Sequence, residues 1–142
     1  MNKSRSGWGA ETEIQVQFFD LDPMEVVWHG HYVKYLEMAR CALLDTIDYN
    51  YTQMKASGYA WPVIDMHLRY VDSARFGQRL KVRAEIAEWE NRLKIHYLIT
   101  DAASGHRLLR GSTTQVAVDI ATREMCFVSP AVLLQKLGIS PS

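Results

Sequence analysis

The order of hydrophobic patterns along this 142-residue chain predicts an α+β fold. One alternating segment comes first, one long helical segment follows, and a run of alternating segments separated by turns fills most of the rest. Strands joined by short turns pair with their neighbours in an antiparallel sheet. Because the helical segment is apolar around much of its circumference, we expect the sheet to curl around it.

The first two elements are predicted from their periods. From Thr12 to Phe19, apolar and polar residues alternate, as in a half-exposed strand. From Gly30 to about Ile47, apolar residues recur at intervals of three and four, which places them on one face of a helix. The charged residues Glu37 and Arg40 lie three apart on this helix, a spacing that favours an ion pair.

The rest of the chain is predicted to be mostly strands. Tyr49 to Gly58 is expected to form a loop with a short helical turn, and Pro130 to Gly138 a short amphipathic helix. A last hairpin tip is expected at Thr122-Arg123. The predicted strands run from Ile64 to Tyr70, from Leu80 to Trp89, from Leu93 to Ile99, from Leu108 to Val118 and from Met125 to Val128.

Composition and charge narrow the class of protein. A hydrophobic fraction of 48% supports a real core, and the length suits one domain spanning residues 1–142. Sixteen basic and sixteen acidic residues cancel without a block of like charge, which argues against nucleic-acid or anionic-membrane binding. We therefore expect a small-molecule ligand or a second copy of the chain as partner.

Location and cysteine chemistry follow from what the sequence contains. Met1 to Gly9 is not followed by the apolar region of an export signal, and no apolar stretch is long enough to span a bilayer. A cytoplasmic location is expected. Cys41 and Cys126 lie far apart in sequence, outside any metal-binding or disulfide pattern, and are predicted to be buried, reduced thiols.

The segment from Asp20 to Tyr32 carries the most chemistry. It ends the first strand and begins the helix, and it places acidic side chains and imidazoles beside a helix N-terminus. Such a terminus has unpaired N–H groups and the positive end of the helix dipole, so it can hold a carboxylate, a phosphate or a developing oxyanion. This combination indicates chemistry on a carbonyl group.

Two other kinds of site are disfavoured. His29 and His31 form a His-x-His pair, but their side chains leave the start of a helix in different directions, and no further His or Cys lies nearby in sequence. A metal site is therefore not expected. A Ser-His-Asp hydrolase is poorly supported because the chain has no Gly-x-Ser-x-Gly motif.

Several motifs resemble those of the hotdog-fold acyl-CoA thioesterases. The resemblance is closest to the branch that contains 4-hydroxybenzoyl-CoA thioesterase and the YbgC-like enzymes, and it covers nearly the whole chain, from Ile14 to about Leu137. It implies a hotdog fold, in which a curled antiparallel sheet wraps one long central helix. The residues that carry it are Asp20-Leu21-Asp22-Pro23, Val26-Val27-Trp28-His29, Tyr32, Glu37-Met38-Ala39-Arg40, Arg69-Tyr70, Ala74-Arg75-Phe76-Gly77 and Thr113 to Asp119.

The resemblance implies roles for individual residues. Asp22 matches the catalytic carboxylate, which acts on the thioester carbonyl as nucleophile or general base without a metal or other cofactor. His29 matches the position whose backbone N–H polarises the thioester oxygen, and its side chain is a candidate for orienting water or protonating the thiolate. Tyr32 matches a tyrosine of the first helical turn and is equally well explained as a core residue. Asp20 is expected to have a supporting or structural part.

The substrate predictions are looser. Arg92 matches by position a basic residue that contacts the nucleotide end of coenzyme A, and Arg75 is a further candidate for binding its phosphates. Glu25 and His31 stand where many relatives have other residues, which leaves the acyl group open. Coenzyme A and acyl carrier protein both remain possible carriers of the acyl group.

The resemblance also implies assembly and leaves two alternatives. Hotdog proteins of this kind pair edge to edge into dimers with active sites across the interface, and often into dimers of dimers, so at least a homodimer and in many relatives a homotetramer is expected. A hotdog dehydratase or hydratase would need an Asp/His pair at another spacing. A non-catalytic acyl-carrier-binding protein would keep the fold and lose the chemistry, against which Asp22 argues.

Overall fold

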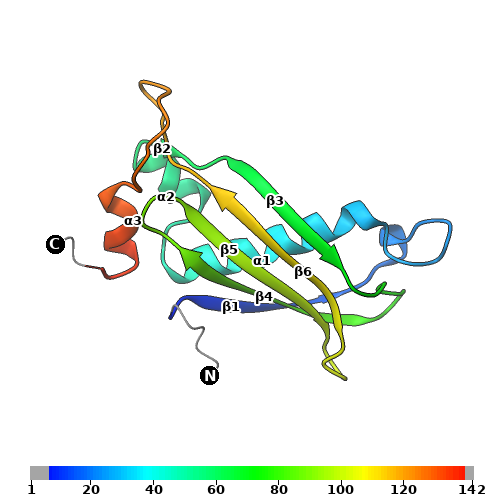
Figure 1. Cartoon of the computed structure of the whole chain (residues 1–142). Coiled ribbons are helices and arrows are strands. Elements are labelled where there is room, and N and C mark those ends of the chain that lie inside the picture. The colour runs from blue at the N-terminus through cyan, green and yellow to red at the C-terminus, as the bar shows by residue number, and fades with distance from the viewer. Residues whose placement is uncertain (1–6, 140–142) are drawn as a thin grey trace.

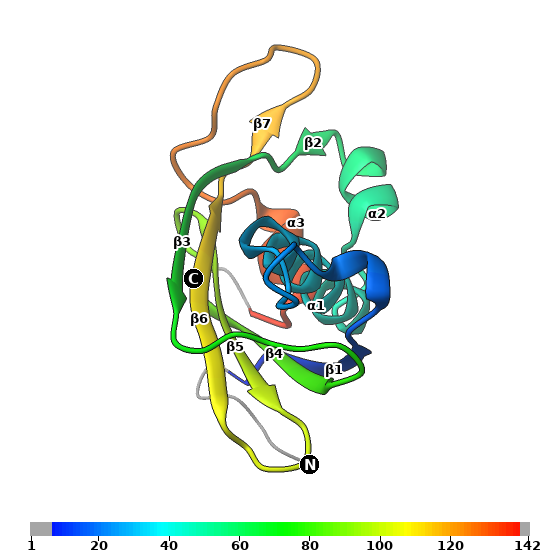
Figure 2. The same ribbon diagram turned by 90° about the vertical axis from the view of Figure 1, so that its right-hand side faces the viewer.

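A curled five-stranded antiparallel sheet wraps one long helix, which confirms the α+β prediction (Figures 1 and 2). The computed structural model describes residues 7–139. Helix α1 spans Tyr32–Thr46 and lies in the concave face of the sheet. The strands, in spatial order, are β1 (Gly9–Gln15), β4 (Arg79–Glu88), β5 (Leu93–Asp101), β6 (Arg107–Gln115) and β3 (Val63–Tyr70).

The core lies between α1 and the inner face of the sheet. Alternate residues of β4 and β5 are fully buried there, as the alternating pattern predicts. Helix α1 contributes Leu36, Ala39 and Leu43, which are all 0% exposed. Burying a leucine of this kind contributes about 2 kcal/mol to folding, so the helix is held in place by its apolar face.

Smaller elements close one end of the molecule. Helix α2 (Tyr51–Ala56) follows α1 and is capped by Asn50, whose side chain accepts a hydrogen bond from the Tyr51 N–H at 2.8 Å. Strands β2 (Tyr59–Ala60) and β7 (Val118–Asp119) pair as a separate two-stranded sheet beside α2, and α3 (Ala131–Lys136) lies at the same end (Figure 1). The hairpin tip predicted at Thr122-Arg123 is confirmed, because Arg123 N–H bonds to the Asp119 carbonyl across the turn.

Two strand predictions were too long. The first strand ends at Gln15, and Phe18–Asp20 forms a 3-10 turn (η1) instead. The Gln17 N–H donates to the Asp20 carboxylate at 2.9 Å, which folds the chain back before Phe19. The last long strand ends at Gln115, and Val118 belongs to the separate β7. No continuous strand follows it: Met125 forms only an isolated bridge with Val118.

Two side-chain predictions were also wrong. Cys41 is exposed, because it lies on the outer face of α1 away from the sheet, whereas Cys126 is half-buried; both are free thiols. Within the described residues, Arg40 forms no ion pair with Glu37. It extends instead toward the sheet, where it lies near the Tyr97 hydroxyl.

The structure tests only one of the predictions about membranes, export and location. In the part of the chain that the structure describes, no helix combines the length and hydropathy needed to cross a membrane. The prediction that Met1 to Gly9 holds no export signal falls largely outside the described residues. The expected cytoplasmic location stays a prediction.

Candidate active site

A cavity of about 340 Å³ opens at the N-terminal end of α1. It lies between the chain that leads into the helix and the chain that leaves β3. The structure brings three of the predicted site residues together in its wall, Asp22, His29 and Tyr32. The remaining lining residues are Val26, Val27, Tyr70, Val71, Asp72 and Ser73.

A tight hairpin positions Asp22. Its backbone N–H donates to the Val26 carbonyl at 2.9 Å, and its carbonyl accepts from the Glu25 N–H at 2.9 Å. Glu25 closes this turn with a φ of 63°, a left-handed conformation that is costly for a residue with a side chain. The Asp22 Oδ1 atom accepts a hydrogen bond from the Met24 N–H at 2.8 Å. Among the described residues Oδ2 has no partner, so one carboxylate oxygen is held and the other remains available to a substrate.

Asp20 has a structural part in the same segment. It is 3% exposed, and its Oδ2 atom accepts hydrogen bonds from the Tyr35 hydroxyl and the Gln17 N–H, both at 2.9 Å. Its carbonyl accepts from the Trp28 N–H at 3.0 Å. Burial, followed by this bond to Asp20, raises the pKa of Tyr35. Asp20 therefore ties the start of the hairpin to α1 and faces away from the cavity that Asp22 lines.

The helical segment begins with backbone donors free at the cavity. A 3-10 turn, η2 (His29–His31), leads directly into α1. Within the described residues, the N–H groups of His29 and Gly30 have no hydrogen-bond acceptor, as is usual for a first helical turn. The His29 carbonyl accepts from the Tyr70 hydroxyl at 2.6 Å, which ties this turn to the end of β3. The His29 side chain is exposed.

Glycine at position 30 is required by a close approach. The Trp28 indole lies against the Gly30 backbone, where a Cβ atom would overlap the ring. The same indole contacts the rings of His29 and His31, with centroids 5.0 and 5.3 Å apart. The rings of Trp28, His29 and His31 therefore form an aromatic cluster at the helix start, and His29 of this cluster lines the cavity.

Tyr32 is a core residue that also lines the cavity. It is 2% exposed and packs edge-on against Tyr35 and Tyr70, so it belongs to the core. Its hydroxyl accepts a hydrogen bond from the Ala74 N–H at 3.0 Å. Burial raises the pKa of Tyr32, so the phenol is protonated at neutral pH. Its O–H can still donate one hydrogen bond.

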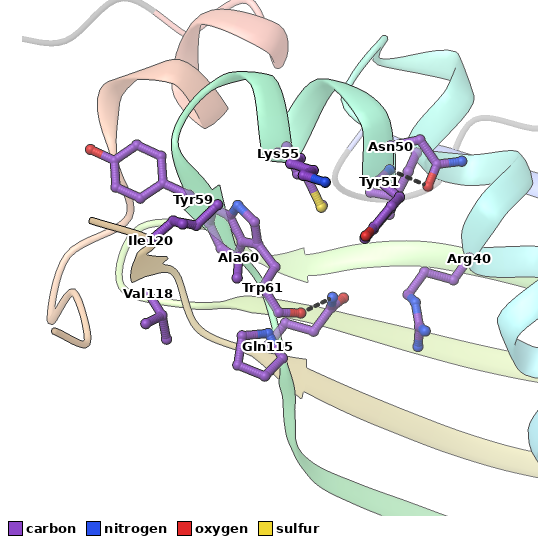
Figure 3. A pocket seen from close by; sticks show the side chains of 13 residues that line it. Arg40, Asn50, Tyr51, Lys55, Tyr59, Ala60, Trp61, Gln115, Val118 and Ile120 are labelled. Carbon is purple, nitrogen blue, oxygen red and sulfur yellow. Dashed lines mark hydrogen bonds between the residues drawn. The ribbon is translucent and has the colours of Figure 1, made fainter. Parts of the chain in front are cut away.

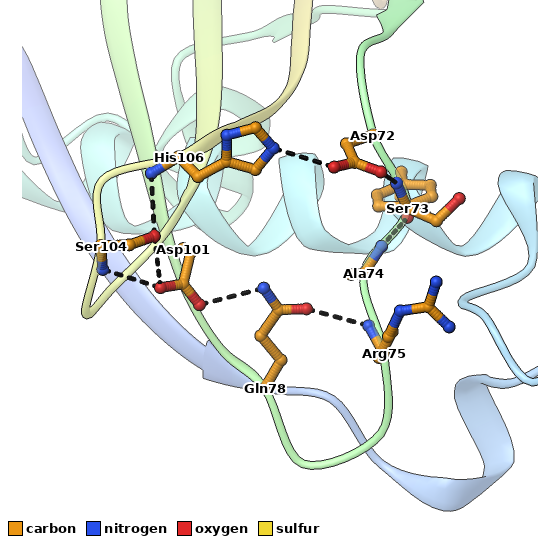
Figure 4. A network of polar contacts seen from close by, with 9 residues as sticks. Asp72, Ser73, Ala74, Arg75, Gln78, Asp101, Ser104 and His106 are labelled. Carbon is orange, nitrogen blue, oxygen red and sulfur yellow. Dashed lines mark hydrogen bonds and ion pairs between the residues drawn. The ribbon is translucent and has the colours of Figure 1, made fainter.

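A polar network holds the opposite wall, the segment from residue 71 to residue 78 (Figure 4). Asp72 Oδ2 lies 2.9 Å from His106 Nε2, and Asp72 Oδ1 accepts from the Ser73 N–H at 2.8 Å. Gln78 connects this segment to the end of β5. Its Oε1 accepts from the Arg75 N–H at 2.9 Å, and its Nε2 donates to Asp101 at 3.0 Å. The wall is thus fastened to the turn between β5 and β6.

The same network lowers the pKa of two carboxyl groups. The hydrogen bond from His106, followed by that from the Ser73 N–H, lowers the pKa of Asp72. The hydrogen bond from Gln78, with those from Ser104, lowers the pKa of Asp101 to about 2. Both groups are charged at neutral pH, where the network is complete.

The two predicted phosphate-binding arginines lie at opposite ends of the sheet. Arg75 is exposed beside the Asp22 hairpin, where its backbone bridges that of Val26. Arg92 is in the turn between β4 and β5, at the end remote from Asp22, and its Nε pairs with Glu88 at 2.9 Å. The structure does not bring Arg92 near Asp22 of the same chain.

Sequence reasoning missed the wall contributed by Tyr70, Asp72 and Ser73. The resemblance to the thioesterases includes Arg69-Tyr70 and the neighbouring segment from Ala74 to Gly77, but it implies a site role only for Arg75. One signal was available: the polar pair Asp72-Ser73 lies in the loop after the strand that ends at Tyr70, and loops often carry the residues of a site. The order of the strands in the sheet decides that this loop faces Asp22, and no pattern in the neighbouring residues predicts it.

Comparisons with known proteins identify the family. The family model of the thioesterase-like superfamily matches residues 16–137. The chain is 30% identical over 128 residues to the putative esterase sll0410 of Synechocystis, covering 89% of this chain and 77% of that protein. It is 23% identical over 110 residues to the putative acyl-CoA thioesterase YneP of Bacillus subtilis, covering 78% and 80%.

A solved structure gives the same fold. The crystal structure of Slr0204, a 1,4-dihydroxy-2-naphthoyl-CoA thioesterase from Synechocystis, superposes with a TM-score of 0.81 at 22% identity, covering 92% of this chain and 96% of that one. The fold is therefore the hotdog fold, as the sequence resemblance implied. The chain belongs to the thioesterase-like superfamily, and its class is that of the thioester hydrolases.

Proposed function

We propose that this protein hydrolyses acyl-CoA thioesters with Asp22 as the catalytic carboxylate. The observation that carries the proposal is the juxtaposition in one cavity of the Asp22 carboxylate and the first turn of the helical segment, whose N–H groups are unpaired. A thioester carbonyl needs both groups, since one attacks its carbon or activates water and the other stabilises the charge that develops on its oxygen.

The reaction balances without a cofactor. In one route Asp22 removes a proton from water, which adds to the carbonyl carbon; in the other, Asp22 adds first and water then hydrolyses the resulting anhydride. Either route breaks the C–S bond, forms a C–O bond and leaves the proton from water on the departing thiolate. The N–H groups of His29 and Gly30 stabilise the tetrahedral oxyanion. Tyr32, which lines the same cavity, would orient substrate or water through its O–H.

Coenzyme A is the proposed carrier of the acyl group. YneP is described as a putative acyl-CoA thioesterase and Slr0204 as a 1,4-dihydroxy-2-naphthoyl-CoA thioesterase, which supports this choice. Arg75, beside the Asp22 hairpin, is exposed at the cavity's side of the molecule and is the nearer candidate for the phosphates. Arg92 would contribute only from a second subunit or after leaving Glu88.

We further propose that the protein acts as a dimer through β3. This strand is at the edge of the sheet, and it exposes Val63, Ile64 and Tyr70, an apolar content that an isolated edge strand seldom leaves in water. A two-fold axis perpendicular to the sheet would pair two β3 strands antiparallel and keep both α1 helices on one face. A tetramer would then be two such dimers. An Ile64→Lys variant should be monomeric by light scattering; a dimer that persists in this variant would contradict the interface.

A free-thiol assay tests the function. Wild type and Asp22→Asn are compared on aromatic, short and long acyl-CoAs and on acyl carrier protein thioesters, with circular dichroism to show equal folding. We expect kcat to fall about 10³-fold in Asp22→Asn. The matched control is Asp48→Asn, an exposed aspartate near the far end of α1 with a φ of 53°, a conformation that asparagine tolerates. No thiol release from any donor, or an unimpaired Asp22→Asn, would refute the proposal.

A further inference from the structure

Tyr70 connects the edge of the sheet to the turn η2 that begins the helical segment. It is the last residue of β3, and this end of β3 reaches the N-terminal end of α1 (Figure 1). Its hydroxyl donates to the His29 carbonyl at 2.6 Å, across 41 positions of the sequence. Most hydrogen bonds from hydroxyl groups are longer than this. The turn is therefore held firmly from the sheet.

The bond is made to a peptide unit of the proposed oxyanion site. The His29 carbonyl and the Gly30 N–H belong to the same peptide unit, which is trans and planar, so the two groups point in opposite directions. The Tyr70 hydroxyl therefore fixes the direction of the Gly30 N–H as well as the position of His29. A hydrogen bond to a carbonyl also polarises its peptide unit, which makes the N–H a stronger donor.

The neighbouring peptide unit is held in a different way. The His29 N–H shares this unit with the Trp28 carbonyl, which accepts from the His31 N–H at 2.9 Å within the turn. The Trp28 N–H in turn donates to the Asp20 carbonyl at 3.0 Å. The first of the two donors is thus placed by residues close to it in sequence, and the second by Tyr70 from a distant strand.

Packing holds the Tyr70 side chain in place. Its ring lies edge-on against Tyr32, with the ring centroids 5.5 Å apart. Tyr32 is 2% exposed, and its hydroxyl accepts from the Ala74 N–H at 3.0 Å. Burial raises the pKa of Tyr70, so its hydroxyl is protonated at neutral pH and donates. The protein by itself therefore forms the bond to His29, and stabilisation of an oxyanion depends on donors that are fixed in advance.

Two other parts for this hydroxyl fit the geometry less well. To donate to a substrate, it would have to release the His29 carbonyl, because a phenol donates one hydrogen bond. If Tyr70 served only for packing, its ring alone would make the contact with Tyr32. The bond to His29 instead favours a part that the hydroxyl plays through the turn.

We propose that Tyr70 is a positioning residue, whose hydroxyl holds the His29–Gly30 peptide so that the turn presents its N–H groups to the oxyanion of the reaction. This proposal rests on the function proposed above. Tyr70 makes and breaks no bond of the substrate, and it acts by keeping the donors aligned. Because the donors matter most when the carbonyl oxygen becomes charged, the hydroxyl should affect kcat more than substrate affinity.

The variant Tyr70→Phe removes the hydroxyl and keeps the ring that contacts Tyr32. kcat and KM are measured on the acyl-CoA that wild type hydrolyses fastest, and circular dichroism and light scattering report folding and assembly. We expect kcat to fall about tenfold with KM within about twofold of wild type, because a misaligned donor loses part of the effect of an oxyanion donor. The matched control is Tyr51→Phe, an exposed tyrosine of α2 near the other end of α1, which should leave both constants unchanged.

Two substrate analogues separate positioning from a part in folding or binding. A trifluoromethyl ketone analogue of the acyl-CoA forms a tetrahedral adduct that resembles the intermediate, and a thioether analogue has a CH₂ group in place of the carbonyl. In Tyr70→Phe the inhibition constant of the ketone should rise about tenfold, by the same factor as kcat falls, since both depend on the same donors. The dissociation constant of the thioether should stay within about twofold of its wild-type value.

Several results would overturn the inference. One is an unchanged kcat in Tyr70→Phe, and another is a lower kcat without weaker inhibition by the ketone. Equal losses of affinity for the ketone and the thioether would show that the hydroxyl binds substrate, and a loss of folding or assembly would assign it a structural part. No thiol release by wild type from any donor would refute the proposed function itself, whereas an active wild type with an unimpaired Tyr70→Phe refutes only the positioning role.

Discussion

The two ends of helix α1 differ in kind. At its N-terminal end, the cavity is small and polar, with a carboxylate and free backbone N–H groups held by a dense set of hydrogen bonds. At the other end, a second cavity of about 550 Å³, between α1, α2 and the β2–β7 sheet, is larger and mostly apolar (Figure 3). In the function proposed above, the N-terminal end carries out the reaction, and the other end differs from it in offering a larger and mostly apolar space.

The largest effect is expected from variants at His29, which distinguish a role of its backbone N–H from a role of its side chain at the N-terminal end of α1. His29→Pro deletes the N–H together with the imidazole, and His29→Ala deletes the imidazole alone, so the difference between the two variants reports on the N–H. Proline is accepted in a first helical turn, and Trp28 already has a φ of −58° and a ψ of 134°, which suits a residue before proline. We expect kcat to fall about 10²- to 10³-fold, whereas His29→Ala should lose only a few-fold. Steady-state kinetics on both variants decide the point, and equal losses would show that the imidazole is the active group.

Asp20→Ala should separate structure from chemistry at the same end. The substitution leaves the Tyr35 hydroxyl and the Gln17 N–H without their shared acceptor, so the free energy of unfolding should fall by about 2–3 kcal/mol. Urea unfolding measures this loss, with Asp22→Asn as the comparison that should unfold like wild type. If Asp22→Asn were the less stable variant, the structural and catalytic assignments of the two aspartates would be reversed.

Two buried tyrosines allow a direct comparison of the ends. Tyr32 accepts from the Ala74 N–H at 3.0 Å, and Tyr49 accepts from Trp61 Nε1 at 3.1 Å. Replacing either with phenylalanine should cost about 1–2 kcal/mol in stability. We expect Tyr32→Phe to lower kcat through the cavity wall, and Tyr49→Phe, at the end of α1 remote from Asp22, to leave kcat unchanged. The reverse pattern in the kinetics would contradict the division between the two ends.

The smallest expected effect is on the stability of the fold at acidic pH. The folded-state pKa of Asp101 is about 2, below its ordinary value of 3.8, so its contribution to stability is present above about pH 4 and is lost as the pH falls toward 2. Asp72 contributes in the same direction. In Asp101→Asn the stability should therefore depend less on pH in this window, as measured by urea midpoints at several acidic pH values. An unchanged pH dependence would mean that Gln78 and Ser104 do not hold this carboxylate in solution.

Prediction from sequence succeeded where the signal was local or periodic. The helix expected from Gly30 to about Ile47 is observed as η2 followed by α1, because its apolar residues repeat with the helical period. The hairpin at Thr122-Arg123 was also predicted correctly. Asp22, His29 and Tyr32 were grouped because they lie within eleven positions of one another, and the structure places all three in one cavity.

Prediction failed where a side chain had two possible partners. Arg40 was expected to pair with Glu37, its neighbour on the helix, but it turns toward the sheet and the second cavity. An exposed ion pair of that kind contributes only a few tenths of a kcal/mol, so packing decides the direction of such a residue. The first strand was extended to Phe19 because its alternation continues, whereas the Asp20 carboxylate folds the chain back through a bond to the Gln17 N–H.

The sequence by itself determined the order of elements, the superfamily resemblance and the segment that holds the carboxylate and the helix N-terminus. These depend on hydrophobic period and on residues close together in the chain. Tertiary structure alone decided that residues 71–73 face Asp22, that Arg92 lies at the far end, and that Arg40 and Gln115 share a cavity. The reason is physical: these groups meet only after the sheet has paired in its order and curled around α1, and no local pattern encodes which residues a curved sheet brings together.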